Sequence, residues 1–159
     1  MKSLAEQVLE AARARGVLIA TAESCTGGLV AAALTDIPGS SAVVERGFVT
    51  YTNRAKVEML GVSQASLNAH GAVSETVARE MACGALAHST ATLSVSITGI
   101  AGPGGSDFKP EGRVCFATAQ GTNVQVETVE FGAIGRANVR AAARDHALGL
   151  LLSRLLPSA

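Results

Sequence analysis

Apolar and polar residues alternate along the chain in two rhythms, one typical of helices and one typical of strands. Apolar positions three or four residues apart, bounded by capping and stop residues, predict helices over about 3–16, 26–36, 53–60, 63–70, 74–88 and 135–155. Continuous or alternating apolar runs predict strands over about 17–22, 42–52, 93–98, 113–119 and 124–131. This order favours one α/β domain over residues 1–159, a three-layer α/β/α sandwich with a mixed sheet of about five strands.

Breaks in the pattern indicate how the second strand and the helix after it are built. The apolar run of 42–52 is interrupted at 45–47, and Gly47 fits a β-bulge. Asn53 is placed to cap the next helix, which puts Lys56 at its third position, in the first turn. A lysine there is usually a solvated surface residue, but the positive end of the helix also favours its neutral form, which a base needs.

The later strands carry three further signals. Residues 121–123 predict a hairpin between the last two strands. In the second of these strands the apolar phase shifts between Val126 and Val129, which indicates a bulge or an edge position. The strand at 93–98 alternates large aliphatic residues with Ser and Thr, so one of its faces is small and hydroxyl-rich and would suit the lining of a cleft.

Composition limits the classes of function. With 17 glycines and no tryptophan among 159 residues, we expect an aliphatic core and many tight turns. Thirteen basic residues balance thirteen acidic ones without runs of like charge, so nothing points to nucleic acid or to a membrane as a partner. The three cysteines and three histidines lack metal-ligand spacing, and no charged and then apolar leader opens the chain. We therefore expect a cytoplasmic protein that needs no metal and no other cofactor.

Candidate chemistry is concentrated where the first strand turns into a helix. Ser24 and Cys25 are both nucleophile types, and Thr26, Gly27 and Gly28 follow them. Glycines let backbone N–H groups approach a bound group, and a helix N-terminus offers unpaired donors to an anion or oxyanion. In open α/β sheets ligands bind outside the carboxyl ends of strands, where this turn is expected. The same residue types also serve as ordinary caps and turn formers, so the turn alone leaves both interpretations open.

Two further segments are candidates for binding. Residues 99–112 form a loop rich in glycine and proline, and such a long loop either shapes a site or only connects elements. Arg136 and Arg140 lie one helical turn apart near the start of the last helix. They form either a solvated face or a clamp for phosphate.

Motifs distributed over nearly the whole chain point to a known family. They are TAESCTGG at 21–28, PGSSAVVERGFVTYTNRAK at 38–56, LGV at 60–62, HGAVSE at 70–75, and SITGIAGPGG at 96–105 followed by KPEGRV at 109–114. In this order and spacing they resemble the CinA C-terminal domain family, whose stand-alone members are PncC-type nicotinamide mononucleotide amidohydrolases. The resemblance implies a three-layer α/β domain that converts the carboxamide of this nucleotide to the acid and ammonia, in pyridine nucleotide recycling. The N-terminal domain of many members is not in this sequence, which favours the stand-alone enzyme.

The resemblance also implies roles for individual residues. A serine and lysine pair falls on Ser24 and Lys56, and Tyr51 on the strand between them either relays a proton, orients the lysine or only packs. A serine hydroxyl would attack the amide while the neutral amine takes its proton. Contacts to the substrate are expected from the turn, the glycine-rich loop and the last helix, namely from Cys25, Thr26, Gly27, Gly28, Thr98, Gly99, Gly102, Gly104, Arg136 and Arg140.

Two alternatives stay open at this point. One is a catalytically silent nucleotide-binding module, like the accessory domains of this family. The other is an amidohydrolase whose nucleophile is Cys25 rather than Ser24. In each case the expected partner is a small pyridine nucleotide, and an alanine-rich, aromatic-poor domain is suited to form a homo-oligomer such as a dimer.

Overall fold

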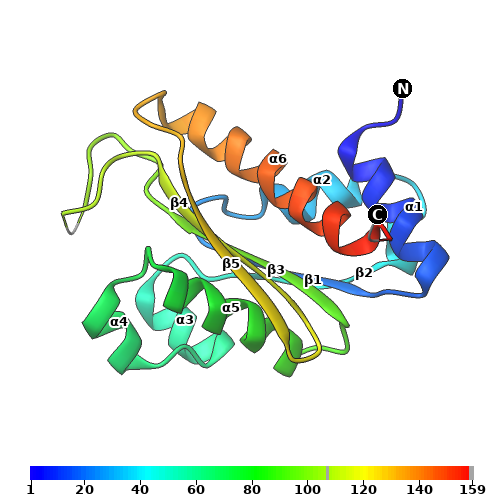
Figure 1. Cartoon of the computed structure of the whole chain (residues 1–159), viewed down its shortest axis with the longest axis horizontal. Coiled ribbons are helices and arrows are strands. Elements are labelled where there is room, and N and C mark those ends of the chain that lie inside the picture. Colours follow the sequence, from blue (N-terminus) through cyan, green and yellow to red (C-terminus); the bar gives the residue numbers. More distant parts are fainter. Residues whose placement is uncertain (107, 158–159) are drawn as a thin grey trace.

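The computed structural model describes residues 1–106 and 108–157. Each element predicted from the sequence is present, with ends that differ by a few residues (Figure 1). In chain order the elements are α1 (Leu4–Arg15), β1 (Ile19–Glu23), α2 (Leu29–Thr35), the 3₁₀ turn η1 (Ser40–Ala42), β2 (Val44–Val49), α3 (Asn53–Leu60), α4 (Gln64–His70), α5 (Glu75–Ala87), β3 (Leu93–Gly99), β4 (Arg113–Gln120), β5 (Asn123–Glu130) and α6 (Arg136–Leu155).

The strands form one mixed sheet in the order β2-β1-β3-β4-β5. β1 pairs in parallel with β2 and β3, whereas β4 is antiparallel to β3 and β5 is antiparallel to β4. Figure 1 shows α1, α2 and α6 on one face of the sheet and α3, α4 and α5 on the other. The predicted three-layer α/β/α fold is therefore confirmed, and the carboxyl ends of β1, β2 and β3 meet at one edge.

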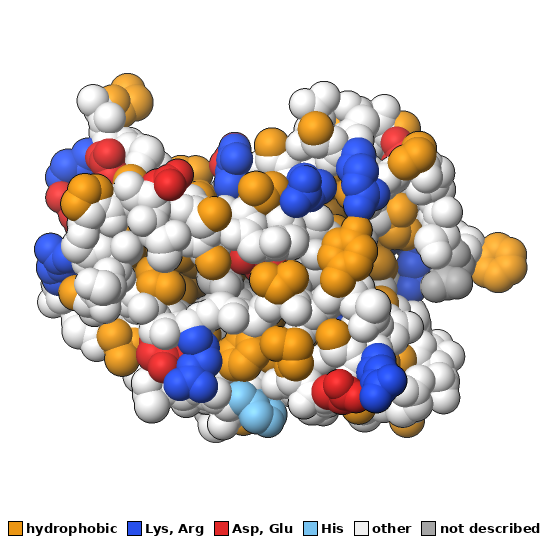
Figure 2. All heavy atoms as spheres, turned by 180° about the vertical axis from the view of Figure 1, so that it is seen from behind, with side chains coloured by type: hydrophobic (Ala, Val, Ile, Leu, Met, Phe, Trp, Pro, Cys, Tyr) orange, Lys and Arg blue, Asp and Glu red, His pale blue; other side chains and the backbone are white. Residues whose placement is uncertain are grey.

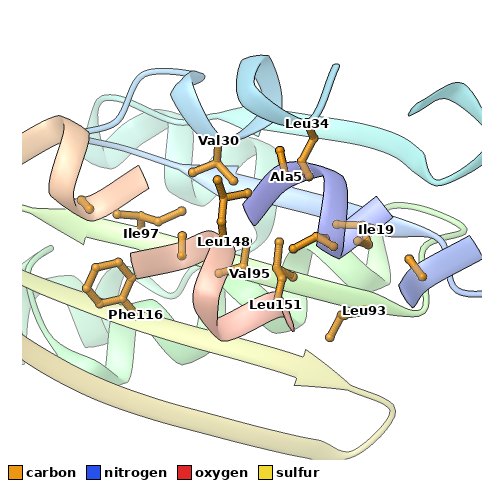
Figure 3. Packing of buried hydrophobic residues seen from close by; sticks show 14 of the residues in the cluster. Ala5, Ile19, Val30, Leu34, Leu93, Val95, Ile97, Phe116, Leu148 and Leu151 are labelled. Carbon is orange, nitrogen blue, oxygen red and sulfur yellow. The ribbon is translucent and has the colours of Figure 1, made fainter. Parts of the chain in front are cut away.

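A large apolar core lies between the sheet and the layer of α1, α2 and α6. Ile19, Val95 and Phe116 from the strands pack with Leu148 and other residues of the helices (Figure 3). Because alternate residues of a strand point to opposite faces, the aliphatic half of β3 enters this core. Burial of these side chains is the main force that holds the layer to the sheet.

The hydroxyl-rich face of β3 packs against α5 instead of lining a cleft along its whole length. Ser94 Oγ donates to the carbonyl of Ala82 at 2.8 Å, and Ser96 Oγ donates to the carbonyl of Ala78 at 2.6 Å. Small side chains let the helix approach closely, and these hydrogen bonds satisfy the buried hydroxyls. Of the hydroxyl-bearing residues of β3, Thr98, near the end of the strand, lines the cleft described below.

Two details around β2 and α3 differ from the sequence prediction. β2 is continuous, and the irregularity in its register with β1 falls at Glu45 rather than at Gly47, since Ile19 pairs with Val44 and Ala20 pairs with Arg46. Thr52, not Asn53, caps α3, because its side chain accepts the N–H of Ala55 at 3.0 Å. Lys56 is therefore the fourth residue of the helix and not the third.

The structure decides between the bulge and the edge position that the sequence left open for β5. β4 and β5 form the predicted hairpin, and their register is regular from Arg113 and Glu130 to Gln120 and Asn123. The shift of apolar phase in β5 thus reflects its position at the edge of the sheet and not a bulge.

The surface agrees with the even balance of charge in the sequence. Figure 2 shows basic and acidic side chains interspersed over the face turned away from the viewer in Figure 1. Within residues 1–106 and 108–157, no helix combines the length and the hydropathy that crossing a membrane requires.

Candidate active site

The turn after β1 is held at the centre of the carboxyl edge of the sheet. The Ser24 N–H donates to the carbonyl of Ile97 at 2.9 Å, and the Thr50 N–H donates to the carbonyl of Glu23 at 2.8 Å. The end of β1 is thereby bonded to the ends of both neighbouring strands. Ser24, the first residue of the turn, is 7% exposed and lines a cleft.

Lys56 reaches Ser24 from α3. Its Nζ lies 2.9 Å from Ser24 Oγ and donates to the carbonyl of Thr50 at 3.0 Å. The side chain is 1% exposed, and this burial lowers the pKa of Lys56 to about 8. From the sequence, burial, the helix N-terminus or both could lower this pKa, and burial is the chief cause in the structure. An amine with such a pKa is partly neutral near physiological pH and can accept a proton.

Gly84 of α5 makes room for the helix that carries Lys56. A Cβ atom at Gly84 would lie 1.9 Å from the carbonyl oxygen of Leu60, the last residue of α3. Because any larger residue would push the two helices apart, glycine at this position supports the depth at which Lys56 is buried.

Cys25 lies beside the pair, but its environment differs. It lines the cleft and is 6% exposed, and burial raises the pKa of its thiol to about 11. A thiol with this pKa stays protonated at neutral pH, whereas a cysteine nucleophile acts as a thiolate. The geometry therefore brings the lysine to Ser24 and leaves Cys25 as a small residue packed next to it.

The cleft has a volume of ≈ 460 Å³ and opens at the carboxyl edge of the sheet. Nine of the residues predicted from the sequence line it: Ser24, Cys25, Tyr51, Lys56, Thr98, Gly99, Gly102, Gly104 and Arg136. Nine further residues line the cleft but were not predicted from the sequence to contact the substrate: Asn53, Ala72, Val73, Ile100, Ala101, Pro103, Gly105, Ser106 and Lys109. Most of these belong to the motifs at 70–75, 96–105 and 109–114, so the motifs marked the segments without identifying which residues face the cleft.

Four predicted binding residues, Thr26, Gly27, Gly28 and Arg140, are not among the described residues that line the cleft. Arg140 instead donates to two carbonyls of the turn, that of Cys25 at 3.0 Å and that of Thr26 at 3.2 Å. Its guanidinium is thus bound to backbone, so we withdraw it as a phosphate ligand. The predicted pair of arginines is divided, and only Arg136 reaches the cleft.

Two N–H groups at the N-terminus of α2 are already bound within the protein. The carboxylate of the fully buried Glu23 accepts the N–H of Val30 at 3.0 Å and the N–H of Ala31 at 3.1 Å. These N–H groups belong to the unpaired donors of the first helical turn. Because the protein's own carboxylate already uses them, the N–H groups of Val30 and Ala31 are not free to bind the substrate.

Arg136 and Tyr51 form a bridge at the mouth of the cleft. Arg136 Nη2 donates to Tyr51 Oη at 2.6 Å, and Arg136 Nη1 donates to the carbonyl of Gly102 at 2.6 Å. Tyr51 is 57% exposed, and the two hydrogen-bond partners of the Lys56 amine are other groups. The structure therefore places Tyr51 with Arg136 rather than with the buried lysine.

One wall of the cleft is a loop that is anchored to the connection between α4 and α5. Lys109 Nζ donates to the carbonyl of His70 at 2.5 Å and to the carbonyl of Val73 at 2.6 Å. The N–H of Gly104 donates to the carboxylate of Glu111, which closes the loop on itself. The prediction for 99–112 is thereby decided in favour of a loop that shapes a site, while its residue Asp107 lies outside the described residues.

The charges around the cleft have one sign. Its described lining includes Lys56, Lys109 and Arg136 and contains no carboxylate. Such a surface attracts an anionic ligand. Within the part of the chain that the structure describes, no three side chains of His, Cys, Asp or Glu come together in a metal-binding group.

Comparison with known proteins agrees with the fold and the motifs. The sequence profile described as "CinA C-terminal domain" matches residues 1–155. "Nicotinamide-nucleotide amidohydrolase PncC" from Escherichia coli K12 is 51% identical over 157 residues, which cover 98% of this chain and 95% of that protein. A protein of the same name from Shigella flexneri is 58% identical over 127 residues, covering 78% of this chain and 77% of that protein.

Solved structures give the same result. The competence/damage inducible protein CihA from Agrobacterium tumefaciens superposes with a TM-score of 0.91 at 51% identity, covering 94% of this chain and 92% of that one. The CinA superfamily protein KP700603 from Klebsiella pneumoniae superposes with a TM-score of 0.92 at 37% identity, covering 96% of this chain and 95% of that one. The chain therefore belongs to the CinA C-terminal domain family.

Proposed function

We propose that the chain is a nicotinamide-nucleotide amidohydrolase that hydrolyses the carboxamide of nicotinamide mononucleotide to nicotinic acid mononucleotide and ammonia. Ser24 is the nucleophile and Lys56 is the base. The observation that carries this proposal is the 2.9 Å contact between Ser24 Oγ and the amine of Lys56, which burial keeps partly neutral. The names of relatives that are 51% and 58% identical support the substrate.

The first half of the reaction forms an ester. The Lys56 amine takes the hydroxyl proton as Ser24 Oγ bonds to the amide carbon, which produces a tetrahedral oxyanion. Collapse of this intermediate breaks the C–N bond, and the Lys56 ammonium returns the proton to the leaving nitrogen, which departs as ammonia. The carbonyl of Thr50 holds one N–H of the amine, so that the lone pair is directed towards Ser24.

The second half of the reaction hydrolyses the ester. The neutral Lys56 takes a proton from water as the water oxygen bonds to the acyl carbon, and the proton then returns to Ser24 Oγ as the ester bond breaks. We assign the oxyanion to the backbone N–H of Cys25, which directly follows Ser24, and to N–H groups between Gly99 and Gly102 other than that of Ile100, which donates to the carbonyl of Arg113 at 2.9 Å. No step in this sequence requires a metal or another cofactor.

The lining of the cleft suggests how the nucleotide is oriented. Ala72, Val73 and Ile100 provide apolar surface for the pyridine ring, which must lie near Ser24. Arg136 uses two of its N–H groups on Tyr51 and Gly102, which leaves further donors of its five for a phosphate group. We therefore assign the phosphate to Arg136. This activity would serve the recycling of pyridine nucleotides, and a cytoplasmic location and a homo-oligomeric state remain predictions.

The direct test measures ammonia released from nicotinamide mononucleotide by the purified wild-type protein, with and without a chelator. We expect release under both conditions, no turnover by Ser24→Ala, and a substantial part of the activity in the neighbouring control Cys25→Ser. If the nucleotide binds to the wild type but no ammonia appears, the chain is a silent binding module. If Ser24→Ala is active and Cys25→Ser is not, the nucleophile is Cys25.

A further inference from the structure

Two charged residues outside the cleft hold the turn that carries Ser24. The first is Glu23, whose side chain is 0% exposed and whose two carboxylate oxygens accept the N–H groups of Val30 and Ala31 at 3.0 and 3.1 Å. The N-cap residue of α2 is Gly28, which has no side chain to cap the helix. Glu23 thus supplies the cap from the residue directly before the nucleophile.

The second charged residue is Arg140 of α6. Its Nε and Nη2 donate to the carbonyls of Cys25 and Thr26 at 3.0 and 3.2 Å. A Cβ atom at Gly27 would lie 3.3 Å from Nη2, so the guanidinium rests closely on the turn. A planar group with donors in a fixed fork sets the orientation of both peptide units at once.

The carboxylate of Glu23 and the guanidinium of Arg140 restrain the turn at different points. Glu23 binds α2 on the far side of the turn, and Arg140 binds the turn itself from an element more than a hundred residues away in sequence. A Ser cap on α2 would satisfy the helix without burying a charge. Glu23 therefore has a role that helix capping alone does not explain, and Arg140 binds the peptide units of the turn itself.

We propose that Glu23 and Arg140 are positioning residues, which hold the turn so that Ser24 Oγ stays within hydrogen-bond distance of the Lys56 amine. This inference rests on the proposed function of Ser24 and Lys56. Neither residue is in the described lining of the cleft, so their loss acts on the attack by Ser24 and not on substrate binding. A displacement of about 1 Å in such a pair lowers the rate of attack about 10²-fold.

The test uses Glu23→Gln and Arg140→Lys in the full chain. Glutamine turns an NH₂ group towards a backbone N–H, and lysine keeps the charge but loses the fork. Glu10→Gln and Arg144→Lys are matched controls, since Glu10 pairs with Lys2 and Arg144 pairs with Asp145, both outside the turn. For each protein we would measure kcat and KM for ammonia release, the pH dependence of kcat, and the rate at which a fluorophosphonate labels Ser24.

The labelling reaction reports on the nucleophile without the nucleotide. Ser24 Oγ bonds to phosphorus, fluoride leaves, and Lys56 takes the hydroxyl proton. We expect kcat and the labelling rate to fall together by about 10²-fold in both variants, with KM little changed. The midpoint of the pH profile should stay in place, because the burial of Lys56 and its bond to Thr50 are not altered. The control variants should match the wild type.

Several results would overturn the proposal. If a folded variant has a lower melting temperature but keeps the kcat and labelling rate of the wild type, its residue is merely structural. If KM rises at constant kcat, the residue contacts substrate instead. If Glu23→Gln does not fold, Arg140→Lys, on a partly exposed side chain, decides the question alone. If the wild type is labelled at Ser24 but releases no ammonia, the proposed function is refuted, and the labelling rates of the variants still test the positioning roles. If the wild type is not labelled and releases no ammonia, the proposed function and the positioning roles are both refuted.

Discussion

Lys56 shows how burial changes the chemistry of a single residue. An exposed lysine with an ordinary pKa is almost wholly charged at neutral pH and cannot act as a base. The 1% exposure of Lys56 removes the water that would stabilise its ammonium, and the pKa falls to about 8. The residue thus exchanges some stability of the folded protein for basicity at the site.

The first prediction concerns the pH dependence of activity. Because the neutral amine is the active form in the proposed mechanism, kcat should rise with pH and reach half of its maximum near the pKa of about 8. Ammonia release between pH 6 and pH 10, with chemistry as the slow step, measures this directly. A flat profile over this range would exclude Lys56 as the base.

The second prediction concerns stability. Lys56→Met should abolish activity but raise the free energy of unfolding at pH 7 by roughly 1–3 kcal/mol. When the wild type folds at this pH, Lys56 must either lose its proton or be buried as a charged ammonium, whereas methionine is uncharged. The folded pKa of Lys56 lies below the unfolded one, so the unfolded state binds more protons between pH 8 and 10.5, and the stability of the wild type rises with pH in this window. Urea unfolding at pH 7 and pH 10 should therefore show the advantage of the variant shrinking at the higher pH.

The elements act as rigid supports that bring short segments to one edge of the sheet. Glycine at position 84 lets α3 and α5 approach, β3 supplies Thr98, and the loop after β3 forms a wall of the cleft. This loop and the connection between α4 and α5 are linked by Lys109. Because both segments line the cleft, loss of the hydrogen bonds of Lys109 should alter substrate binding, although Lys109 does not contact Ser24 or the Lys56 amine.

The third prediction tests this link. Lys109→Met removes two hydrogen bonds from an ammonium to backbone carbonyls, and we expect kcat/KM for nicotinamide mononucleotide to fall about tenfold, equivalent to about 1.4 kcal/mol. Lys2→Met, which breaks an exposed pair with Glu10, is the control and should leave the kinetics unchanged. Equal kcat/KM in the two variants would mean that the anchor contributes nothing to the site.

At the scale of the whole molecule, the cleft is assembled from segments that are distant in sequence. The turn after β1, the strand end before α3, the glycine-rich loop and the start of α6 all contribute to it. The Arg136 bridge joins two of its walls, since it contacts both Tyr51 and Gly102. A cleft with three basic residues and no carboxylate among its described lining is suited to a nucleotide phosphate.

The fourth prediction concerns this phosphate. Arg136→Met should raise KM for nicotinamide mononucleotide by about 10-fold to 10²-fold, as expected for the loss of hydrogen bonds to a charged group. The kinetics for nicotinamide riboside, which lacks the phosphate, should change little. Tyr51→Phe removes the hydroxyl that Arg136 contacts but keeps the cation, so it should preserve the preference for the nucleotide. An equal loss for nucleotide and riboside in Arg136→Met would contradict the assignment.

The sequence by itself determined the elements, the layers and the family. The starts of the helices near Ser3 and Ser74, the end of α3 before Gly61 and the hairpin at 121–123 depend on neighbouring residues, so the ranges that the sequence predicts for them agree with the structure. The prediction of Asn53 as the cap of α3 is wrong, because the preceding Thr52 has the extended backbone of a cap residue and its side chain accepts the N–H of Ala55.

Only the tertiary structure decided which polar groups meet. Ser24 and Lys56 are 32 residues apart, Tyr51 and Arg136 are 85 apart, and Cys25 and Arg140 are 115 apart. Arg136 and Arg140 lie one helical turn apart and could not be told apart from the sequence. In the structure, Arg136 lines the cleft, whereas Arg140 binds the backbone carbonyls of Cys25 and Thr26. Likewise, the depressed pKa of Lys56 comes from burial between elements, and burial depends on how the whole chain packs and not on the residues next to the lysine.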